Sequence, residues 1–233
     1  MKAYLTASRE LAPNTRHFEF ESPEWSARFV AGQFLSLTRT IHDQEITRAY
    51  SIASPPGGNQ FALCANLVDD GRFSPFLFGM HPGDEVDFKG PYGAFILRRA
   101  PADCIFVATG TGIAPFRSML LDMSASQPER RISLIFGVRH EYGLLYHDEW
   151  LQLARDCPNF DYRPTLTRPG DAWIGRRGRV QAHVLAALQE DALQDRRNPD
   201  VYICGLREMV DDLRRLLKEE GLDRKRIIYE KYD

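Results

Sequence analysis

The sequence predicts two domains of different architecture: an antiparallel β-barrel over residues 1–100 and an α/β, doubly wound parallel sheet of five strands over residues 101–233. Three observations support this division. The first hundred residues contain short, partly alternating apolar runs separated by turn residues, which is typical of antiparallel strands. The remainder alternates strand-like with helix-like segments, which is typical of a parallel sheet covered by helices. A chain of 233 residues is long enough for two domains of ordinary size.

Five strands are predicted in the first half, where runs rich in β-branched and aromatic residues recur. They are AYLTAS, TRHFEFES, QFLSLTRT, ITRAYSIAS and FALCANLV. Turn residues separate them, as at residues 55–59 and 81–84, where Pro and Gly cluster. The stretch GRFSPFLFGM differs, because Ser74 precedes Pro75, the pairing expected of a helix N-cap and the first helical residue. We therefore predict a short helix there, with Ser74 as its N-cap.

The pattern changes after residue 100. The run CIFVATG, residues 104–110, is continuously apolar, as expected of a strand that is buried on both faces. Helix-like and strand-like segments then alternate, in the order APFRSMLLDMSAS, RISLIFGV, DEWLQLARDC, FDYRPTLT, VQAHVLAALQED, DVYICG, REMVDDLRRLLKEEG and RIIYEKY. Five strands alternating with four helices predict a parallel, doubly wound sheet.

The composition excludes several classes of function. The net charge of −2 argues against a general nucleic-acid binder, since such proteins are usually basic. No apolar run approaches the ~18 residues of a membrane span, and the N-terminus lacks the apolar core of a signal peptide. The four cysteines form no CxxC pair, which gives no support to a metal site or a disulfide framework. We expect a cytoplasmic protein that binds no nucleic acid, spans no membrane and holds no metal ion.

The stretch ITRAYSIAS, residues 46–54, places three polar residues inside a strand-like run. Successive side chains of a strand point to opposite faces, so Arg48 and Tyr50 share one face and Ser51 points to the other. An antiparallel strand with one face in water explains this arrangement. The stretch alone does not decide whether the three residues have a further task.

Ligands of a parallel sheet bind at the carboxyl ends of the strands, so the residues that follow each strand are candidates. In ATGTGIAPF, Gly110 and Gly112 would let the backbone approach a ligand without a Cβ in the way. Pro115 suits the first turn of the next helix, whose N–H groups attract an anion such as a pyrophosphate. Because Pro115 occupies the third glycine position of GxGxxG, the usual dinucleotide-binding motif is absent. The glycine loop by itself leaves its ligand open.

Two later strands are also followed by candidate residues. Thr167 and Arg168 end the strand FDYRPTLT, and Arg176 and Arg177 follow closely. The planar guanidinium group suits phosphate, although a solvated arginine-rich loop is an alternative. Cys204 ends the strand DVYICG, where the default role of a buried cysteine is that of a small apolar side chain.

Together these residues resemble the ferredoxin–NADP(H) reductase family of flavoproteins, and the resemblance covers nearly the whole chain. Each motif is short, but six of them occur in the family's order. They are RxYS at residues 48–51, Gly-x-x-Ser at 71–74, GPxG at 90–93, GTGIAP at 110–115, Cys-Gly at 204–205 and Glu-x-Tyr at 230–232. The resemblance implies an FAD-binding barrel domain followed by an NAD(P)-binding α/β domain.

The resemblance also implies roles in binding FAD. Arg48 would pair with the pyrophosphate, Tyr50 would stack on one face of the flavin ring, and Ser51 would reach flavin N5. Gly71 and Ser74 belong to the second flavin motif, whose helix would direct its N-terminus at the same pyrophosphate. Since a flat strand would turn Ser51 away from a ring stacked on Tyr50, we expect the strand to bend or end near Tyr50.

Further roles concern the nicotinamide. Thr111, between the two glycines of the loop, and Cys204 would line the nicotinamide pocket, with Cys204 close to the hydride path. Glu230 would belong to the same pocket. Tyr232 would cover the other flavin face and give way when nicotinamide enters. Ser51, Cys204, Glu230 and Tyr232 are therefore the candidate catalytic residues.

The activity implied is hydride transfer between NADP(H) and flavin N5, and single-electron transfer between the flavin and ferredoxin or flavodoxin. The carrier would be a separate acidic protein, and a basic surface with Lys89, Arg98 and Arg99 could attract it. The preference for NADP follows from Thr167 and the nearby arginines, which could bind a 2′-phosphate.

Two alternatives remain open. WIGRRGRV resembles the WxGxxGxV segment of reductases that use NADH, so the chain could be the reductase component of an oxygenase system or a free-flavin reductase. A non-catalytic regulatory subunit with the same fold is the other alternative. Such subunits often carry an added cysteine cluster near the C-terminus, which this sequence lacks.

Overall fold

The computed structural model of the chain describes residues 1–26, 28–98, 102–123, 130–193 and 199–232. Its contacts define two compact units. The first comprises Met1–Leu97 with Ala114–Met123, and the second comprises Arg98–Ile113 with Ser124–Asp233. A domain boundary near residue 100 remains a prediction, because helix α2 (Ala114–Met123) groups with the first unit while the strand before it groups with the second.

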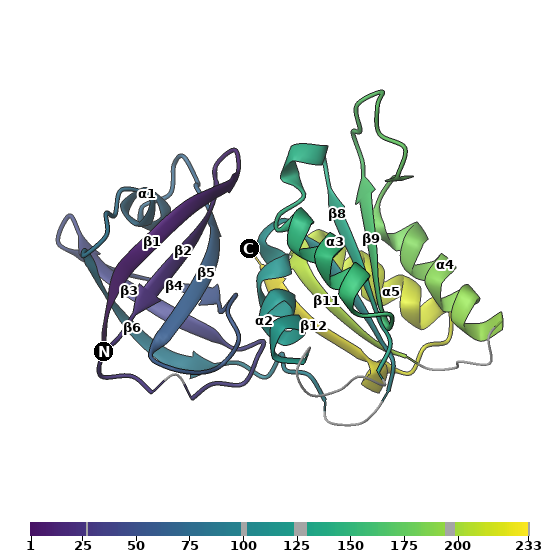
Figure 1. The fold of residues 1–233 in the computed structure, drawn as a ribbon, viewed down its shortest axis with the longest axis horizontal. Coiled ribbons are helices and arrows are strands. Elements are labelled where there is room, and N and C mark those ends of the chain that lie inside the picture. Colours follow the sequence, from purple (N-terminus) through teal and green to yellow (C-terminus); the bar gives the residue numbers. More distant parts are fainter. Residues whose placement is uncertain (27, 99–101, 124–129, 194–198, 233) are drawn as a thin grey trace. The chain divides into compact units, whose positions relative to one another are not determined.

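The first unit is built on one antiparallel six-stranded sheet (Figure 1). Its strands are β1 (Lys2–Ala12), β2 (Thr15–Glu21), β3 (Phe34–Ile41), β4 (Gln44–Ser51), β5 (Gln60–Asn66) and β6 (Glu85–Tyr92), in the order β4-β3-β6-β1-β2-β5. Just beyond β4, Ile52 forms a bridge with Leu63 of β5, which joins the two ends of the sheet. The predicted antiparallel barrel is therefore confirmed, and β6 adds a strand to the five predicted runs.

Alternation along these strands fills the barrel with apolar side chains. Phe18, Phe20, Leu35, Leu37 and Phe88 are at most 1% exposed and belong to one cluster. The side chains between them on the same strands point outward and are more polar, as expected of an antiparallel sheet with one face in water. Burial of the large aromatic rings is the main source of stability for this unit.

The predicted short helix exists as α1 (Phe73–Phe78), but Ser74 is not its N-cap. Arg72 occupies that position with helical backbone angles and no side-chain cap bond, so the helix begins one residue before Ser74. The Ser74 hydroxyl instead accepts a hydrogen bond of 3.0 Å from the backbone N–H of Val68. The serine therefore ties the preceding loop to the first turn. A Ser-Pro pair marks a helix start but does not distinguish these two uses of the hydroxyl.

The contacts that join helix α2 to the first unit include a hydrogen bond and an aromatic pair. Arg117 donates a hydrogen bond of 2.8 Å to the backbone oxygen of Ala53, just after the Ile52 bridge. The ring of Phe116 meets that of Phe95 edge to face, with centroids 5.6 Å apart. The helix thus secures the segment that closes the barrel.

The second unit contains a fully parallel sheet in the order β10-β9-β8-β7-β11-β12. All five predicted strands are present: β7 (Cys104–Thr109), β8 (Ile132–Val138), β9 (Phe160–Leu166), β11 (Asp200–Leu206) and β12 (Ile227–Tyr232). The two-residue β10 (Arg176–Arg177) adds a sixth strand at the edge. It was not predicted, because two arginines in an exposed loop give no strand pattern.

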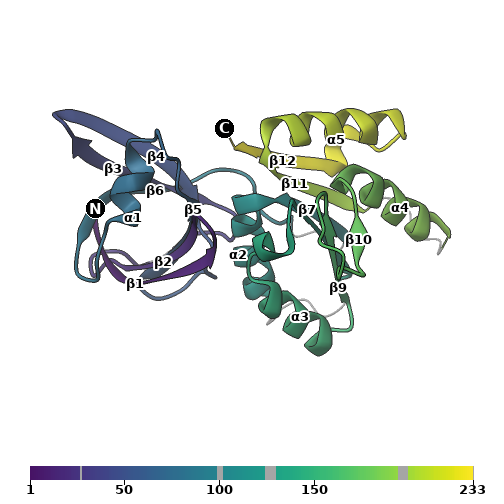
Figure 2. The same ribbon diagram turned by 90° about the horizontal axis from the view of Figure 1, so that it is seen from above.

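Helices cover both faces of this sheet, as Figure 2 shows for α3 (His147–Asp156) on one side and α4 (Val180–Leu193) and α5 (Arg207–Glu219) on the other. Odd-numbered strand residues such as Val107, Ile135 and Ile203 form one core cluster with α4 and α5. Even-numbered residues face the opposite side, where His147 of α3 meets the Tyr162 hydroxyl at 3.1 Å. The central strands β7, β8 and β11 are buried on both faces, which accounts for their largely apolar sequences.

The order of the strands reverses between β7 and β11. From β7 the chain proceeds to β8 and β9 on one side, and β11 and β12 then lie on the other. The carboxyl ends of β7 and β11 are thus neighbours at the switch point of the sheet, where open α/β sheets bind ligands. Among the residues that the structure describes, no helix combines the length and apolar character needed to cross a membrane.

Candidate functional site

The flavin residues predicted on ITRAYSIAS lie on β4, an end strand of the first sheet. Tyr50 and Arg48 are paired with Leu35 and Leu37 of β3, so the two side chains leave the same face, while Ser51 leaves the other. Arg48 is exposed and donates a hydrogen bond of 2.8 Å to its neighbour's backbone oxygen, Thr47 O. The structure thus presents a cation and a ring side by side.

Strand β4 ends where the sequence predicted. Its last residue is Ser51, and the next residue, Ile52, donates its N–H to the backbone oxygen of Gln33 at 3.0 Å. The chain then pairs with β5 through the Ile52 bridge. The expectation that the strand bends or ends near Tyr50 is confirmed, and Ser51 itself is only 6% exposed.

Tyr50 is half-buried against α1. Its ring centroid lies 6.0 Å from that of Phe73, at an interplanar angle of 39°. Burial raises the pKa of Tyr50 to about 12, and the charge of Arg48 opposes this rise. The phenol is therefore neutral at physiological pH and offers an uncharged ring to a planar partner.

Gly71 and Ser74 surround the turn that leads into α1. The N–H of Gly71 donates to Val68 O at 2.8 Å, and a Cβ at this position would lie 2.9 Å from that oxygen and 3.0 Å from the Ser74 hydroxyl. Only a glycine leaves the turn this compact. Gly71 and Ser74 of the second flavin motif therefore shape the turn that leads into α1, the helix against which Tyr50 packs.

These observations fit a flavin dinucleotide. Arg48 supplies an exposed guanidinium suited to a pyrophosphate, and Tyr50 supplies a neutral ring supported from behind by Phe73. The residues of the two predicted flavin motifs lie within the first unit, on β4 or in the turn into α1 and its first residues, whereas Tyr232, predicted to cover the other flavin face, belongs to the second unit. Their individual roles remain predictions.

The predicted nicotinamide loop occupies the switch point of the second sheet. After β7 the chain forms a 3₁₀ turn, Gly110–Ile113, in which Gly110 has φ of +54° and nothing within 4 Å of a Cβ built there. Gly112 has no such room, because its Cβ would lie 2.4 Å from Cys204 O and 2.8 Å from Gly205 Cα. The loop after β7 therefore rests directly on the end of β11, and Thr111 is half-exposed beside it.

Cys204, Glu230 and Tyr232 share one face of this part of the sheet. Cys204 pairs with Glu230 in the parallel register, and Tyr232 lies two residues further along β12. Burial raises the pKa of Cys204 well above its usual value, and the Glu230 carboxylate adds to this rise. A hydrogen bond between the Cys204 and Tyr232 side chains acts in the opposite direction. Cys204 is thus an uncharged thiol at neutral pH, which agrees with its being a small spacer and not a nucleophile.

Thr109 is a residue of the switch point that the sequence analysis did not single out. Its hydroxyl oxygen is buried and has no hydrogen-bond partner among the described residues. A Cβ at Gly205 would lie 2.3 Å from this oxygen, so no residue larger than glycine fits beside the hydroxyl without displacing it. An orphaned buried hydroxyl suggests a polar ligand, which fits the binding of a nicotinamide at this edge. Its position directly before Gly110 was the available signal.

The predicted phosphate-binding residues follow β9 and form β10. Thr167 and Arg168 are exposed, and their backbone N–H groups donate to Val138 O at 3.0 Å and Arg139 O at 2.8 Å. Arg176 is exposed, and among the described residues neither its guanidinium nor that of Arg168 has a hydrogen-bond or ion-pair partner. These two side chains are available for a phosphate.

Arg177 is engaged differently. Its Nη2 donates a hydrogen bond of 2.8 Å to Trp173 O, while the Trp173 indole N–H donates to Arg176 O at 2.9 Å. A Cβ at Gly175 would lie 2.4 Å from the indole ring. The Trp and Gly of WIGRRGRV therefore shape the loop that carries the arginines.

Arg139 was also missed. It directly follows β8, is exposed, and its carbonyl accepts the N–H of Arg168. Its place directly after the strand RISLIFGV, at the carboxyl end of a parallel strand, is the sequence signal that identifies this arginine. The carboxyl edge therefore carries cations after both β8 and β9.

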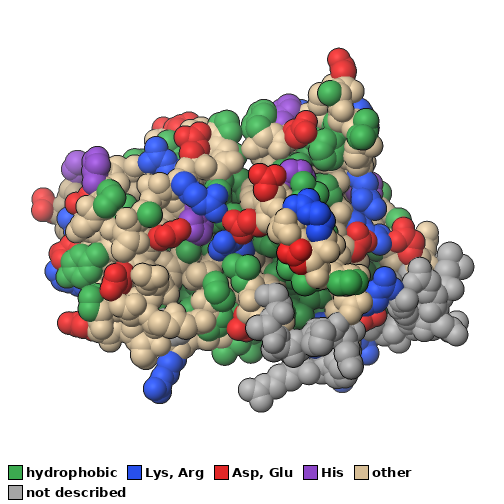
Figure 3. Space-filling model, viewed as in Figure 1, with side chains coloured by type: hydrophobic (Ala, Val, Ile, Leu, Met, Phe, Trp, Pro, Cys, Tyr) green, Lys and Arg blue, Asp and Glu red, His purple; other side chains and the backbone are tan. Residues whose placement is uncertain are grey.

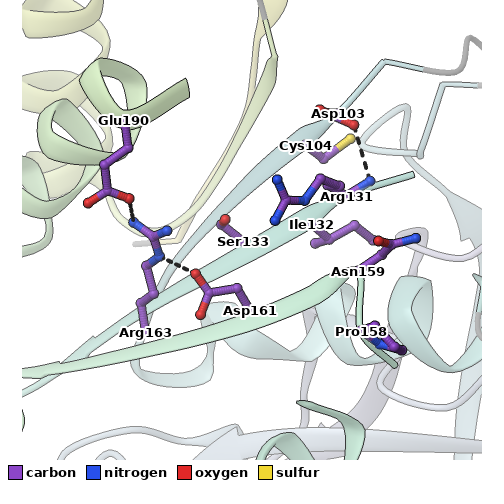
Figure 4. Close-up of a pocket in the computed structure, with 10 residues that line it drawn as sticks. All are labelled: Asp103, Cys104, Arg131, Ile132, Ser133, Pro158, Asn159, Asp161, Arg163 and Glu190. Atoms are coloured by element: carbon purple, nitrogen blue, oxygen red, sulfur yellow. Dashed lines mark hydrogen bonds and ion pairs between the residues drawn. The ribbon is translucent and has the colours of Figure 1, made fainter. Parts of the chain in front are cut away.

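A polar pocket lies at the opposite edge of the same sheet (Figure 4). Its lining includes Cys104 and Ile132, which are the first residues of β7 and β8, so it is separated from the switch point by the length of β7, about 17 Å. Arg163 projects there between Asp161 and Glu190, at 2.5 and 2.8 Å. Because these charges satisfy one another, the pocket is a poor candidate for a dinucleotide.

The predicted carrier-binding cations are only partly available. Lys89 is exposed on β6, whereas Arg98 lies 3.8 Å from the buried Asp200, and Arg99 lies outside the described residues. On the face drawn in Figure 3, Lys and Arg side chains are interspersed with Asp and Glu. This face therefore shows no separate basic surface. The described residues also contain no group of three His, Cys, Asp or Glu side chains suited to a metal ion.

Comparison with known proteins gives consistent matches over the whole chain. Residues 2–96 match the model of an oxidoreductase FAD-binding domain, and residues 106–215 match that of an oxidoreductase NAD-binding domain. The chain is 40% identical over its full length to ferredoxin–NADP reductase B of Sorangium cellulosum (strain So ce56) and covers 97% of it. It is 32% identical to the phenol 2-monooxygenase reductase component DmpP of Pseudomonas sp. (strain CF600), over 99% of this chain and 65% of that protein.

A solved structure supports the same relationship. The ferredoxin NADP+ reductase of Neisseria gonorrhoeae with bound FAD and NADP has a TM-score of 0.83 and 26% sequence identity to this chain. The match covers 100% of this chain and 97% of that one. The similarity therefore includes both units.

Proposed function

Since the chain belongs to the ferredoxin–NADP(H) reductase family of FAD- and NAD(P)-binding oxidoreductases, we propose that it links NADP(H) in the cytoplasm to a separate ferredoxin or flavodoxin. The family and the oxidoreductase activity follow from the matches over both halves of the chain. The preference for NADP over NAD is inferred from Arg168 and Arg176, whose exposed guanidinium groups have no hydrogen-bond or ion-pair partner within the described residues. Flavin chemistry suits this task, because a flavin accepts a hydride and releases electrons singly.

In this proposal, residues of the first unit bind and orient FAD. Arg48 neutralises the pyrophosphate, and Tyr50 stacks on the ring system with Phe73 behind it. Ser51, buried at the end of β4, provides a hydroxyl near the reacting edge of the flavin. Gly71 and Ser74 keep the turn before α1 compact, so that Phe73 is held against Tyr50.

Residues of the second unit bind and align the nicotinamide. The Gly110–Gly112 turn allows close approach of the ligand to the backbone, and Thr111 lines the pocket beside it. Cys204 and Glu230 border the same pocket from neighbouring strands. Tyr232 would cover the flavin ring and give way to nicotinamide, as the family resemblance implies, so its position would affect the affinity for the nucleotide.

An NADH-dependent reductase of an oxygenase system is the second candidate. The observation in its favour is the similarity to oxygenase reductase components, including DmpP and the electron transfer component of toluate 1,2-dioxygenase. The segment WIGRRGRV does not by itself favour an NADH-dependent reductase, because Trp173 and Gly175 have a structural role in the loop. This structural role would be the same whether the loop binds NADPH or NADH.

The phosphate assignment is tested by replacing Arg168 with alanine. Loss of one charge-assisted hydrogen bond to the 2′-phosphate is expected to raise the KM for NADPH about tenfold. The kinetics with NADH, which lacks this phosphate, should not change, so NADH is the internal control. Steady-state rates with both nucleotides provide the measurement. A wild-type preference for NADH that Arg168→Ala does not affect would exclude the NADP assignment.

A further inference from the structure

Strand β12 carries two sets of side chains on its two faces. Glu230 and Tyr232 share the face of Cys204, because Cys204 is paired with Glu230 in the parallel register. Tyr229 and Lys231 leave the opposite face, which helix α5 covers (Figure 2). The alternation thus separates the residues assigned to the nicotinamide pocket from those that contact the helix.

The contacts with α5 form a connected group. Asp211 Oδ1 accepts a hydrogen bond of 2.6 Å from Lys231 Nζ and lies 3.2 Å from Arg214 Nη1. The Arg214 guanidinium in turn lies over the Tyr229 ring, 3.6 Å from its centroid. We call these four residues, Asp211, Arg214, Tyr229 and Lys231, the α5–β12 clamp. Through these contacts, Asp211 and Arg214 of α5 hold Lys231 and Tyr229, the two residues of β12 that flank Glu230.

Backbone pairing holds β12 from one side. The strand ends the sheet order, so among the described residues its ladder is made with β11 alone, and Tyr232 is the last of them in that ladder. A strand that is hydrogen-bonded along one side depends on side-chain contacts to hold its last residues in place. Since Lys231 is directly adjacent to Tyr232, the clamp secures the final residues of the strand.

We propose that the α5–β12 clamp, through Asp211, is a positioning device that sets how readily Tyr232 yields to nicotinamide. This inference rests on the role of Tyr232 in the proposed function. The clamp restrains the backbone on both sides of Glu230 and so holds Tyr232 in its stacked position. Weakening the clamp lets Tyr232 leave more easily, which strengthens nucleotide binding and slows turnover, because product is then released more slowly.

The test replaces Asp211 with asparagine in the FAD-loaded protein and measures the Kd for NADP+ from the change in flavin absorbance. We expect the Kd to fall about two- to fivefold, the size of effect that a surface ion pair can exert. Asp212→Asn is the matched control, since Asp212 pairs with Arg215 within α5 at 3.8 Å. Asp212→Asn should leave the Kd for NADP+ unchanged. Asp211→Glu, which keeps the carboxylate, should retain the wild-type Kd. If Asp211→Asn does not fold, Lys231→Met breaks the same ion pair from the strand.

A double-mutant cycle with Tyr232→Ser separates the possible failures. Tyr232→Ser should lower the Kd by itself, and Asp211→Asn should add nothing in that background. If Tyr232→Ser leaves the Kd unchanged, the role of Tyr232 in the proposed function is wrong, and the clamp inference falls with it. If Tyr232→Ser acts as expected but Asp211→Asn behaves like Asp212→Asn, or acts equally in both backgrounds, the clamp inference alone is overturned.

Discussion

Replacing Arg48 with alanine is expected to weaken FAD binding about 10- to 150-fold, the effect of losing a charge-assisted hydrogen bond to phosphate. The guanidinium is exposed on β4, and within the described part of the chain its hydrogen bonding is limited to the adjacent Thr47 O. Removing an exposed side chain of this kind usually changes folding stability by about 0.5 kcal/mol or less. Cofactor loss should therefore occur without unfolding.

The dissociation constant of FAD, measured by the fluorescence of released flavin, is the observable for Arg48→Ala. Arg155→Ala is a suitable control, because Arg155 is an exposed arginine of α3 that contacts Gln152 on the same helix. The control should retain FAD as the wild type does. An Arg48→Ala protein that folds and binds FAD with unchanged affinity would remove Arg48 from the flavin site.

Gly112→Ala is expected to have the second large effect, because the switch point has no space for a methyl group. The new Cβ would meet backbone atoms of Cys204 and Gly205 at 2.4 to 2.8 Å. Strand β11 cannot yield easily, since Cys204 is paired with β7 on one side and β12 on the other. Overpacking of this kind costs about 1–3 kcal/mol of folding free energy. The strain falls on the loop that would bind nicotinamide.

We expect Gly112→Ala to raise the Kd for NADP+ about tenfold or more and to lower the melting temperature by several degrees. Gly170→Ala is the matched control, because no atom lies within 4 Å of a Cβ at that position. Isothermal titration and thermal unfolding of both variants provide the measurement. If the two variants behave alike, the contact between the turn and β11 does not control nucleotide binding.

The architecture was largely predictable from the sequence because its periodicities are strong. Alternation marked the barrel strands, and largely apolar runs marked the central parallel strands β7, β8 and β11, which are buried on both faces. Two details were not predictable. The Ser74 hydroxyl bonds to Val68, five residues before the first residue of the helix, and β10 exists because the arginine loop returns alongside β9. The first is a local bond within one loop, which a Ser-Pro pair does not distinguish from a helix cap, and the second depends on a contact between two separate segments.

The candidate site was predictable where a residue type has a clear chemical use. Glycines, arginines and an aromatic ring at strand ends could be identified, and β4 ends at Ser51 as expected. Thr109 and Arg139 were missed because a threonine inside an apolar strand and a lone arginine after one have ordinary explanations. Their significance comes from the orphaned hydroxyl of Thr109 and from the hydrogen bond between the backbones of Arg139 and Arg168.

The most direct test of the proposed function is to mix the FAD-loaded protein anaerobically with oxidised flavodoxin or ferredoxin and either NADPH or NADH. Reduction of the carrier is followed by its own absorbance spectrum. We predict that NADPH supports rapid reduction of at least one carrier and that NADH supports it more slowly. Rapid NADH oxidation that reduces added free flavin, with neither carrier reduced by either nucleotide, would contradict the proposal.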